Sequence, residues 1–158
     1  MAETELNLAR NVARLLSERG LTVAVAEGTT GGRIGERLVR RSGASAFFKG
    51  SIVTYDYPSR TTVLGIPRKL LATHGAVSEQ VVRAMAQAVR AKFGADLGLA
   101  STGVAGPGGQ QVGMVCIAVA TEESTRSTRH DLPSGSRLQL HQCFTSLALR
   151  LLAEVASA

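Results

Sequence analysis

The stretch AEGTTGG at residues 26–32 and the stretch STGVAGPGG at residues 101–109 decide the fold of this chain. Each follows a short apolar run, LTVAV at residues 21–25 and LGLA at residues 97–100, which predicts a buried strand that ends at the turn. Glycines at the carboxyl end of a strand let the backbone turn tightly and bring its N–H groups close to a ligand. The two turns therefore predict an α/β protein with a polar small-molecule site.

Hydroxyl groups accompany both glycine turns. Thr29 and Thr30 lie in the first turn, and Ser101 and Thr102 open the second. We therefore expect the two turns to form two walls of one pocket, with Thr30 and Thr102 on its surface.

The rest of the chain alternates helical and strand patterns. Apolar periodicity predicts helices over residues 4–19, from the first glycine turn to about 41, over 58–64, over 78–94 and after 136, with a short turn at 67–75. Strands are predicted over residues 21–26, 48–55, 96–101, 112–120 and 125–132, of which the last two form a hairpin with the final strand at an edge. This order predicts a three-layer α/β/α sandwich around a mixed sheet. Because no linker or repeat interrupts it, we expect a single domain over residues 1–158.

Composition excludes several classes of protein. The chain of 158 residues is 44% hydrophobic, enough to bury a core, yet it has no apolar run of the ~18 residues that a membrane span needs. The start MAETE is acidic and unlike a secretory signal, so we expect a cytoplasmic protein without membrane association. Cys116 and Cys143 have no metal-ligand spacing and are expected to be small core residues, and we expect no metal and no cofactor.

The net charge of +6 raises the question of nucleic-acid binding. The arginines are spread along the chain, however, and no aromatic residues alternate with them as stacking platforms would. We therefore expect no nucleic-acid partner, whereas a small anionic ligand is compatible with this charge.

Several separate motifs carry a family resemblance. They are AEGTTGG at 26–32, VTY at 53–55, HGAVSE at 74–79, GAD at 94–96 and TGVAGPGG at 102–109. Their order, over about residues 6–152, resembles the CinA C-terminal domain family, which includes the stand-alone PncC-type nicotinamide-nucleotide amidases. The resemblance implies a compact α/β fold. It also implies descent from enzymes that release ammonia from the carboxamide of nicotinamide mononucleotide.

The resemblance also implies that the catalytic pair is missing. Family members typically have a serine nucleophile in the first glycine turn and a lysine base after the second strand, and these align with Gly28 and Arg60. Glycine offers no nucleophile, and an arginine stays protonated and cannot accept a proton. Tyr57 replaces an asparagine of the same motif. We therefore expect a catalytically impaired member. The alternative is an active amidohydrolase that uses Thr29 or Thr30 as a substitute nucleophile.

The remainder of the expected site matches the family and suits an anion. N–H groups at a helix start bind phosphate, and arginine offers a planar fork that can hold phosphate through two bonds. We expect a phosphate or nucleotide pocket, with a pyridine mononucleotide as the implied ligand, in a homo-oligomer for which a dimer is favoured. The residues expected to contact the ligand are Glu27, Thr30, Gly31, Gly32, Tyr55, Arg60, Thr102, Gly106, Gly108 and Arg137.

Overall fold

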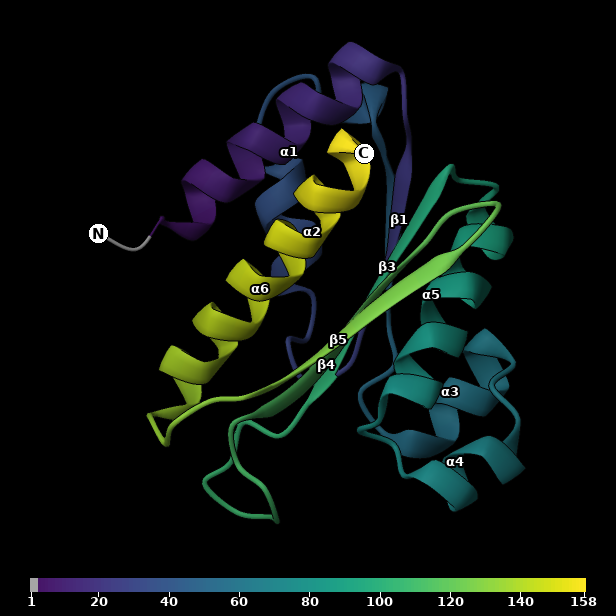
Figure 1. Ribbon diagram of the computed structural model, residues 1–158, viewed down its shortest axis with the longest axis vertical. Coiled ribbons are helices and arrows are strands. Elements are labelled where there is room, and N and C mark those ends of the chain that lie inside the picture. Colours follow the sequence, from purple (N-terminus) through teal and green to yellow (C-terminus); the bar gives the residue numbers. More distant parts are fainter. Residues whose placement is uncertain (1–2) are drawn as a thin grey trace.

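A computed structural model describes residues 3–158 and contains one five-stranded sheet of order β2-β1-β3-β4-β5 (Figure 1). β1 pairs in parallel with both β2 and β3, while β4 is antiparallel to β3 and to β5. The sheet is therefore mixed, and β5 is an edge strand of a terminal hairpin, as the sequence predicts. The strands are β1 (Val23–Glu27), β2 (Phe48–Val53), β3 (Leu97–Gly103), β4 (Met114–Ala120) and β5 (Thr125–Asp131).

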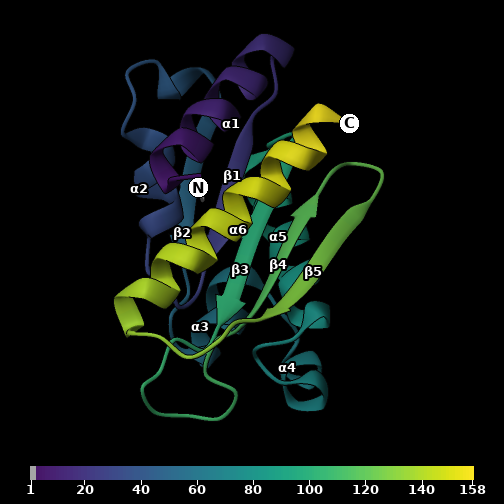
Figure 2. The ribbon, with the colours of Figure 1, turned by 60° about the vertical axis from the view of Figure 1, so that its left-hand side comes forward.

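Helices cover both faces of the sheet (Figures 1 and 2). On one face lie α1 (Glu5–Arg19), α2 (Arg33–Val39) and α6 (Arg137–Ser157). On the other lie α3 (Tyr57–Leu64), α4 (Arg68–His74) and α5 (Glu79–Phe93). A single 3-10 turn, η1 (Ala44–Ala46), precedes β2. The predicted three-layer α/β/α sandwich is confirmed.

Successive side chains of β1 point to opposite faces of the sheet, and each face has its own apolar core. Val23 and Val25 point to the side of α1 and α6, whereas Ala24 and Ala26 point to the side of α5. The small residues on the α5 side let that helix approach the sheet closely. A Cβ atom at Gly98 of β3 would overlap the carbonyl oxygen of Ala86 in α5.

One expectation about the cysteines needs correction. Cys143 is exposed, so its prediction as a core residue is wrong. The inward face of α6 carries Phe144 and Ala148, and their neighbour Cys143 turns to solvent. Cys116 is buried in β4 as predicted, and burial raises the pKa of its thiol to about 11.

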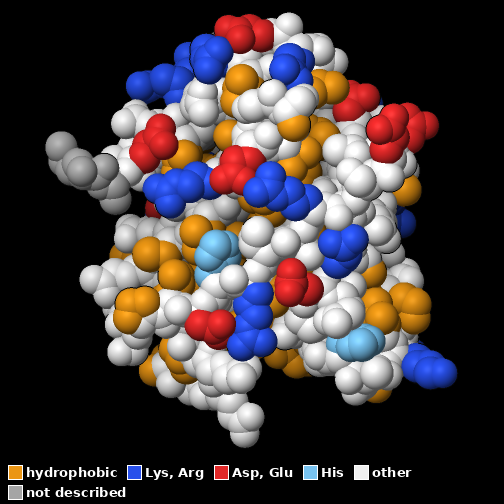
Figure 3. Space-filling view, viewed as in Figure 1, with side chains coloured by type: hydrophobic (Ala, Val, Ile, Leu, Met, Phe, Trp, Pro, Cys, Tyr) orange, Lys and Arg blue, Asp and Glu red, His pale blue; other side chains and the backbone are white. Residues whose placement is uncertain are grey.

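Charged side chains of both signs are spread over the surface, as the sequence predicts. Positive and negative side chains are interspersed on the face shown in Figure 3, so the basic residues form no continuous stripe there. Within residues 3–158, no helix combines the length and the apolar character that crossing a membrane requires.

Candidate functional site

The two glycine turns meet at the carboxyl ends of neighbouring strands. Glu27 of β1 lies beside Ser101 of β3, and the Gly28 N–H donates to the Ser101 carbonyl oxygen at 3.0 Å. The Thr54 N–H donates to the Glu27 carbonyl oxygen at 2.9 Å, which brings the end of β2 to the same edge. Parallel pairing therefore places three distant segments of the sequence together, where α/β proteins commonly bind ligands.

The Glu27 carboxylate holds the first glycine turn in place through hydrogen bonds. Its buried carboxylate accepts hydrogen bonds from the Thr30 hydroxyl at 2.7 Å and from the N–H groups of Ile34 and Gly35 at 2.9 and 3.0 Å. Three donors compensate for the loss of water around this charge. The carboxylate thereby joins the end of β1 to the start of α2, and it already uses amide groups that a phosphate would need there.

Arg60 is the second buried charge of the site. Among residues 3–158, Glu27 and Arg60 are the charged residues classed as buried, and Arg60 is 2% exposed. Its Nη1 donates to the Ala76 carbonyl oxygen at 2.5 Å, and the same oxygen accepts from the Thr102 hydroxyl at 3.0 Å. This shared acceptor links α3, the loop before α5 and the second glycine turn.

The Arg60 guanidinium has less compensation than the Glu27 carboxylate. Its Nε is buried with no hydrogen-bond partner, and none of the ion pairs within residues 3–158 includes it. Burial lowers the pKa of the guanidinium, with a smaller opposing effect from Tyr57. Arginine still keeps its proton near neutral pH, so a positive charge lies buried without a carboxylate.

Gly28 lies directly against this guanidinium. A Cβ atom at residue 28 would be 2.6 Å from Nη2 of Arg60, which is closer than such atoms approach. Gly31 and Gly32 have φ angles of 61° and 107°, whereas Gly28 is not among the glycines with positive φ. A side chain at position 28 would therefore force the Arg60 guanidinium to move, whereas the backbone conformation of residue 28 does not itself call for glycine.

A cavity of about 360 Å³ opens above this pair. Thr29 comes from the first glycine turn and Gly103 from the end of β3, so the two turns share the cavity. Tyr55 and Tyr57 are 57% and 55% exposed, unusually open for aromatic side chains. The lining residues are Thr29, Tyr55, Asp56, Tyr57, Arg60 and Gly103.

Asp56 is the one carboxylate in that lining. It caps α3 by accepting from the Ser59 N–H at 2.9 Å. This backbone bond, with help from the Ser59 hydroxyl, lowers the pKa of the Asp56 carboxyl, so the side chain stays ionised in solvent.

Arg137, at the start of α6, contacts a lining residue of the cavity. Its Nη1 donates to the Gly106 carbonyl oxygen at 2.6 Å and its Nη2 to the Tyr55 hydroxyl at 2.7 Å. Both acceptors are neutral. The positive charge of Arg137 therefore adds to that of Arg60 at this edge of the sheet.

The expected ligand residues fall into three groups. Tyr55 and Arg60 line the cavity. Thr102, Gly106 and Arg137 lie one hydrogen bond from a lining residue or its partner. The others stand in the turns: Glu27 and Thr30 in the network under α2, Gly31 and Gly32 at the helix start, and Gly108 exposed in the loop between β3 and β4.

Sequence reasoning missed the Ala76 carbonyl oxygen and the lining position of Gly103. Ala76 lies in the HGAVSE motif, which was recognised, but a backbone acceptor has no signature in side-chain types. Gly103 belongs to the second turn, but a glycine has no side chain that would mark it as a lining residue.

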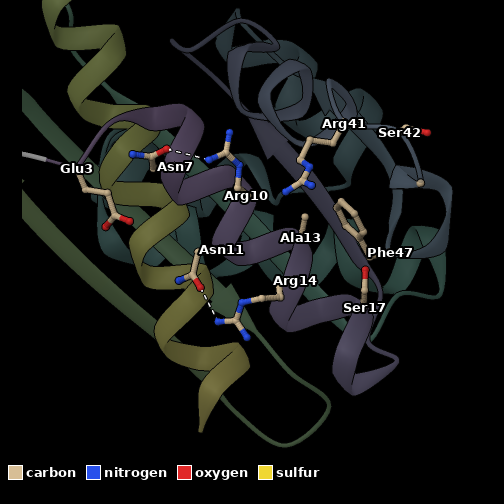
Figure 4. A pocket seen from close by; sticks show the side chains of 11 residues that line it. Glu3, Asn7, Arg10, Asn11, Ala13, Arg14, Ser17, Arg41, Ser42 and Phe47 are labelled. Carbon is tan, nitrogen blue, oxygen red and sulfur yellow. Dashed lines mark hydrogen bonds between the residues drawn. The ribbon is translucent and has the colours of Figure 1, made fainter.

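A larger cavity, of about 760 Å³, lies elsewhere, on α1 and the loop after α2 (Figure 4). Its arginines are exposed, and Arg10 and Arg14 donate to the side chains of Asn7 and Asn11 along the helix. None of its lining residues belongs to a glycine turn. Within residues 3–158, no group of His, Cys, Asp or Glu side chains is arranged to hold a metal ion.

The family model of the CinA C-terminal domain, which describes its sequences, matches residues 5–156. The chain belongs to the CinA C-terminal domain family. A CinA-like protein of a Synechococcus strain is 43% identical over 157 residues, and one of Gemmatimonas aurantiaca is 44% identical over 144 residues. These alignments cover 93% and 87% of this chain but 38% and 33% of the relatives. The chain therefore spans about a third to two-fifths of the length of these relatives.

Solved structures of the CinA superfamily share the fold along its whole length. The competence damage-inducible protein A of Klebsiella pneumoniae superposes with a TM-score of 0.94 at 30% identity, covering 98% of each chain. A competence/damage inducible protein of Agrobacterium tumefaciens gives a TM-score of 0.93 at 29% identity over 100% of both chains. The sandwich of this CinA C-terminal domain thus agrees closely with the family's architecture.

Proposed function

We propose that this protein binds a small phosphate-bearing nucleotide, and that it lacks efficient amidase activity. The resemblance implies a pyridine mononucleotide as the ligand. The observation that carries the proposal is the buried guanidinium of Arg60 against Gly28, with no carboxylate partner. A buried charge without a counter-ion is costly to the folded state, and a bound anion would offset that cost.

Gly28 and Arg60 are also incompatible with amide hydrolysis by the mechanism of the family, which uses a serine nucleophile and a lysine base. Amide hydrolysis needs a nucleophile, a base to accept its proton and donors for the oxyanion. Gly28 has no nucleophilic atom, and Arg60 does not accept a proton. Loss of an acyl-transfer nucleophile lowers turnover by about a millionfold in a well-studied hydrolase.

Ammonia release from nicotinamide mononucleotide tests the catalytic half of the proposal. The purified protein would be measured beside a family member that carries the serine and the lysine. We expect release at or near the uncatalysed rate. A rate within about tenfold of that member would refute the proposal, since such a rate corresponds to a barrier difference of only about 1.4 kcal/mol.

The alternative function, an active amidohydrolase, depends on a substitute nucleophile, and Thr29 is the better-placed candidate. It lines the cavity, whereas the Thr30 hydroxyl donates to Glu27 and is buried. Of the two candidate substitutes, Thr29 therefore has the better position. If ammonia release is found, Thr29→Val should abolish it and Thr30→Val should act through stability; the opposite result would favour Thr30.

Titration calorimetry with nicotinamide and nicotinate mononucleotides tests the binding half. We expect binding that weakens in Arg60→Gln and persists in Arg150→Gln, a matched exposed arginine on α6. No heat and no thermal shift at millimolar ligand would overturn it, because a ligand that binds the folded state must raise its stability.

The assembly and cellular location belong to the same proposal. We propose a homo-oligomer, with a dimer favoured, in the cytoplasm. Sedimentation velocity at micromolar concentration tests the assembly, and a monomer throughout would contradict it.

A further inference from the structure

The cavity of about 760 Å³ on α1 is an elongated groove (Figure 4). Its lining follows α1 from Asn7 to Ser17, and the loop after α2 forms the opposite wall. Because an α-helix rises about 1.5 Å per residue, the α1 wall is about 15 Å long. Ala13 and Phe47 are the buried residues of the lining. A groove of this length suits an extended ligand better than a single small ion.

Three guanidinium groups border the groove. Arg10 and Arg14 lie one turn apart on α1, and Arg41 reaches toward this helix from the loop (Figure 4). No ion pair within residues 3–158 includes Arg10 or Arg41. Arg14 pairs with Glu18, but more than half of each side chain is exposed, so this pair contributes little. The groove therefore carries positive charge that the protein does not itself neutralise.

The arginines next to the groove differ in this respect. Those in α2 and at its end pair with the carboxylates of Glu5 or Glu36, and they are Arg33, Arg37 and Arg40. Arg10 and Arg14 instead form a like-charge pair four residues apart, which destabilises a helix. A bound anion would relieve that repulsion, so the groove gains more from an anion than the neighbouring surface does.

Neutral donors lie between the arginines. The side-chain oxygens of Asn7 and Asn11 each accept from the arginine three residues further along α1, at 3.4 and 2.9 Å (Figure 4). Since their acceptors are used, both amides turn NH₂ donors to a ligand. Exposed hydroxyls of Ser17 and Ser42 add to the lining. Glu3 is its one carboxylate, at the end remote from Ser42 (Figure 4).

This set of donors favours phosphates that are linked to one another. Phosphate oxygens accept bonds from guanidinium forks and from neutral donors in several directions, whereas a carboxylate offers two oxygens in one plane. Residues four apart on a helix have Cβ atoms about 5–6 Å apart, so Arg10 and Arg14 match charges that follow one another closely. Linked phosphates provide such charges, and their chain extends along the groove.

We propose that this groove binds a chain of linked phosphates, held by Arg10, Arg14 and Arg41 with the asparagine and serine side chains as further donors. Inorganic tripolyphosphate and the triphosphate of a nucleotide share this chemistry. The site is separate from the cavity between the glycine turns, and it does not depend on the proposed function.

Three phosphate probes test the inference: tripolyphosphate, ATP and orthophosphate. Titration calorimetry at low and moderate salt and protein NMR spectra would follow their binding. We expect tripolyphosphate and ATP to bind below millimolar concentration, and orthophosphate at least about tenfold more weakly. Binding should weaken with salt, because the arginines are exposed. Resonances of Gly43 and Ser17, which line the groove, should shift.

The comparison of ATP with tripolyphosphate identifies the source of the phosphates. Equal affinity would assign the site to the phosphate chain alone. ATP binding about tenfold more tightly would assign it to a nucleotide, whose base and sugar then add contacts.

Variants assign the binding to the groove. The double variant Arg10→Gln with Arg41→Gln should weaken tripolyphosphate binding at least about tenfold. Arg68→Gln is the matched control, since it removes an exposed arginine from α4 on the other face of the sheet. Arg60→Gln should also leave tripolyphosphate binding unchanged. Thermal unfolding shows that each variant is folded.

Each outcome decides the inference. Orthophosphate or hexaglutamate binding as tightly as tripolyphosphate would overturn it, as would undiminished binding in the folded double variant. If tripolyphosphate binding is lost in Arg60→Gln and kept in the double variant, the inference fails and the anion site of the proposed function stands. If mononucleotides bind and tripolyphosphate does not, the inference again fails alone.

Discussion

At the residue scale, Gly28 and Arg60 act as one steric unit. Nη2 of Arg60 occupies the space that a side chain at residue 28 would fill, and the backbone of residue 28 does not itself call for glycine. Substitutions at the two positions should therefore be strongly non-additive.

Gly28→Ser should destabilise the protein by about 1 kcal/mol, because the guanidinium must move and loses its bond to Ala76. Adding Arg60→Lys should recover most of that loss. Urea unfolding of the parent, both single variants and the double variant measures the coupling. Gly108→Ser is the control, since a Cβ atom there meets nothing within 4 Å. Additive effects would show that the two residues are independent.

Glu27→Ala should cost about 3 kcal/mol of unfolding free energy, because it leaves the buried donors of Thr30, Ile34 and Gly35 without an acceptor. Glu18→Ala, at an exposed ion pair with Arg14, should cost little by comparison. Urea unfolding measures both losses of unfolding free energy, from the shift of the midpoint when the dependence of that free energy on urea is unchanged. Equal effects would contradict the structural role of Glu27.

At the element scale, the contact between α5 and β3 depends on Gly98. A Cβ atom there would overlap the Ala86 carbonyl oxygen and approach the backbone of Arg90, neither of which is a flexible side-chain end. The sequence pattern predicts both elements correctly but contains no sign of how closely they approach.

Gly98→Ala should consequently destabilise the protein by about 3 kcal/mol, near the upper end for overpacking. Gly108→Ala should be close to neutral. Thermal and chemical denaturation of both variants provide the comparison. A Gly98→Ala protein as stable as the parent would mean that α5 can shift outward at no cost.

At the scale of the whole molecule, the end of the sheet opposite the cavity carries a separate polar contact. The Asp96 carboxylate accepts from the Thr22 N–H at 2.8 Å and from the Thr22 hydroxyl at 2.9 Å, which joins the starts of β1 and β3. The backbone bond is the largest cause that lowers the pKa of the Asp96 carboxyl, followed by the hydroxyl bond.

A lowered carboxyl pKa stabilises the folded state at neutral pH, and this contribution is lost as pH falls through the folded-state pKa. The difference in unfolding free energy between the parent and Asp96→Asn should therefore be present at pH 7 and shrink as the pH falls below about 4. Ligand binding should be unchanged in Asp96→Asn. If the difference in unfolding free energy between the parent and Asp96→Asn grew in acid, the stabilising role of the ionised Asp96 carboxylate would be contradicted.

The sequence by itself determined the architecture of this protein and the location of its candidate site. Residues 21–32 and 97–109 carry both strand and turn signals, because apolar runs and glycines act locally. Local signals also predicted the terminal hairpin and most helix ends. They misplaced Cys143, because the rotation of α6 against the sheet depends on packing.

Only the tertiary structure decided what each site residue touches. Arg60 comes from a short helix, Ala76 from a loop and Gly28 from a strand end, so their meeting depends on how α3 packs at the edge of the sheet. The family motif singles out Arg60, but nothing in the sequence shows that this arginine, among the chain's 18 Lys and Arg residues, is buried. Burial turns it into a buried charge without a counter-ion, because the energy of a charge depends on the water that the surrounding fold removes.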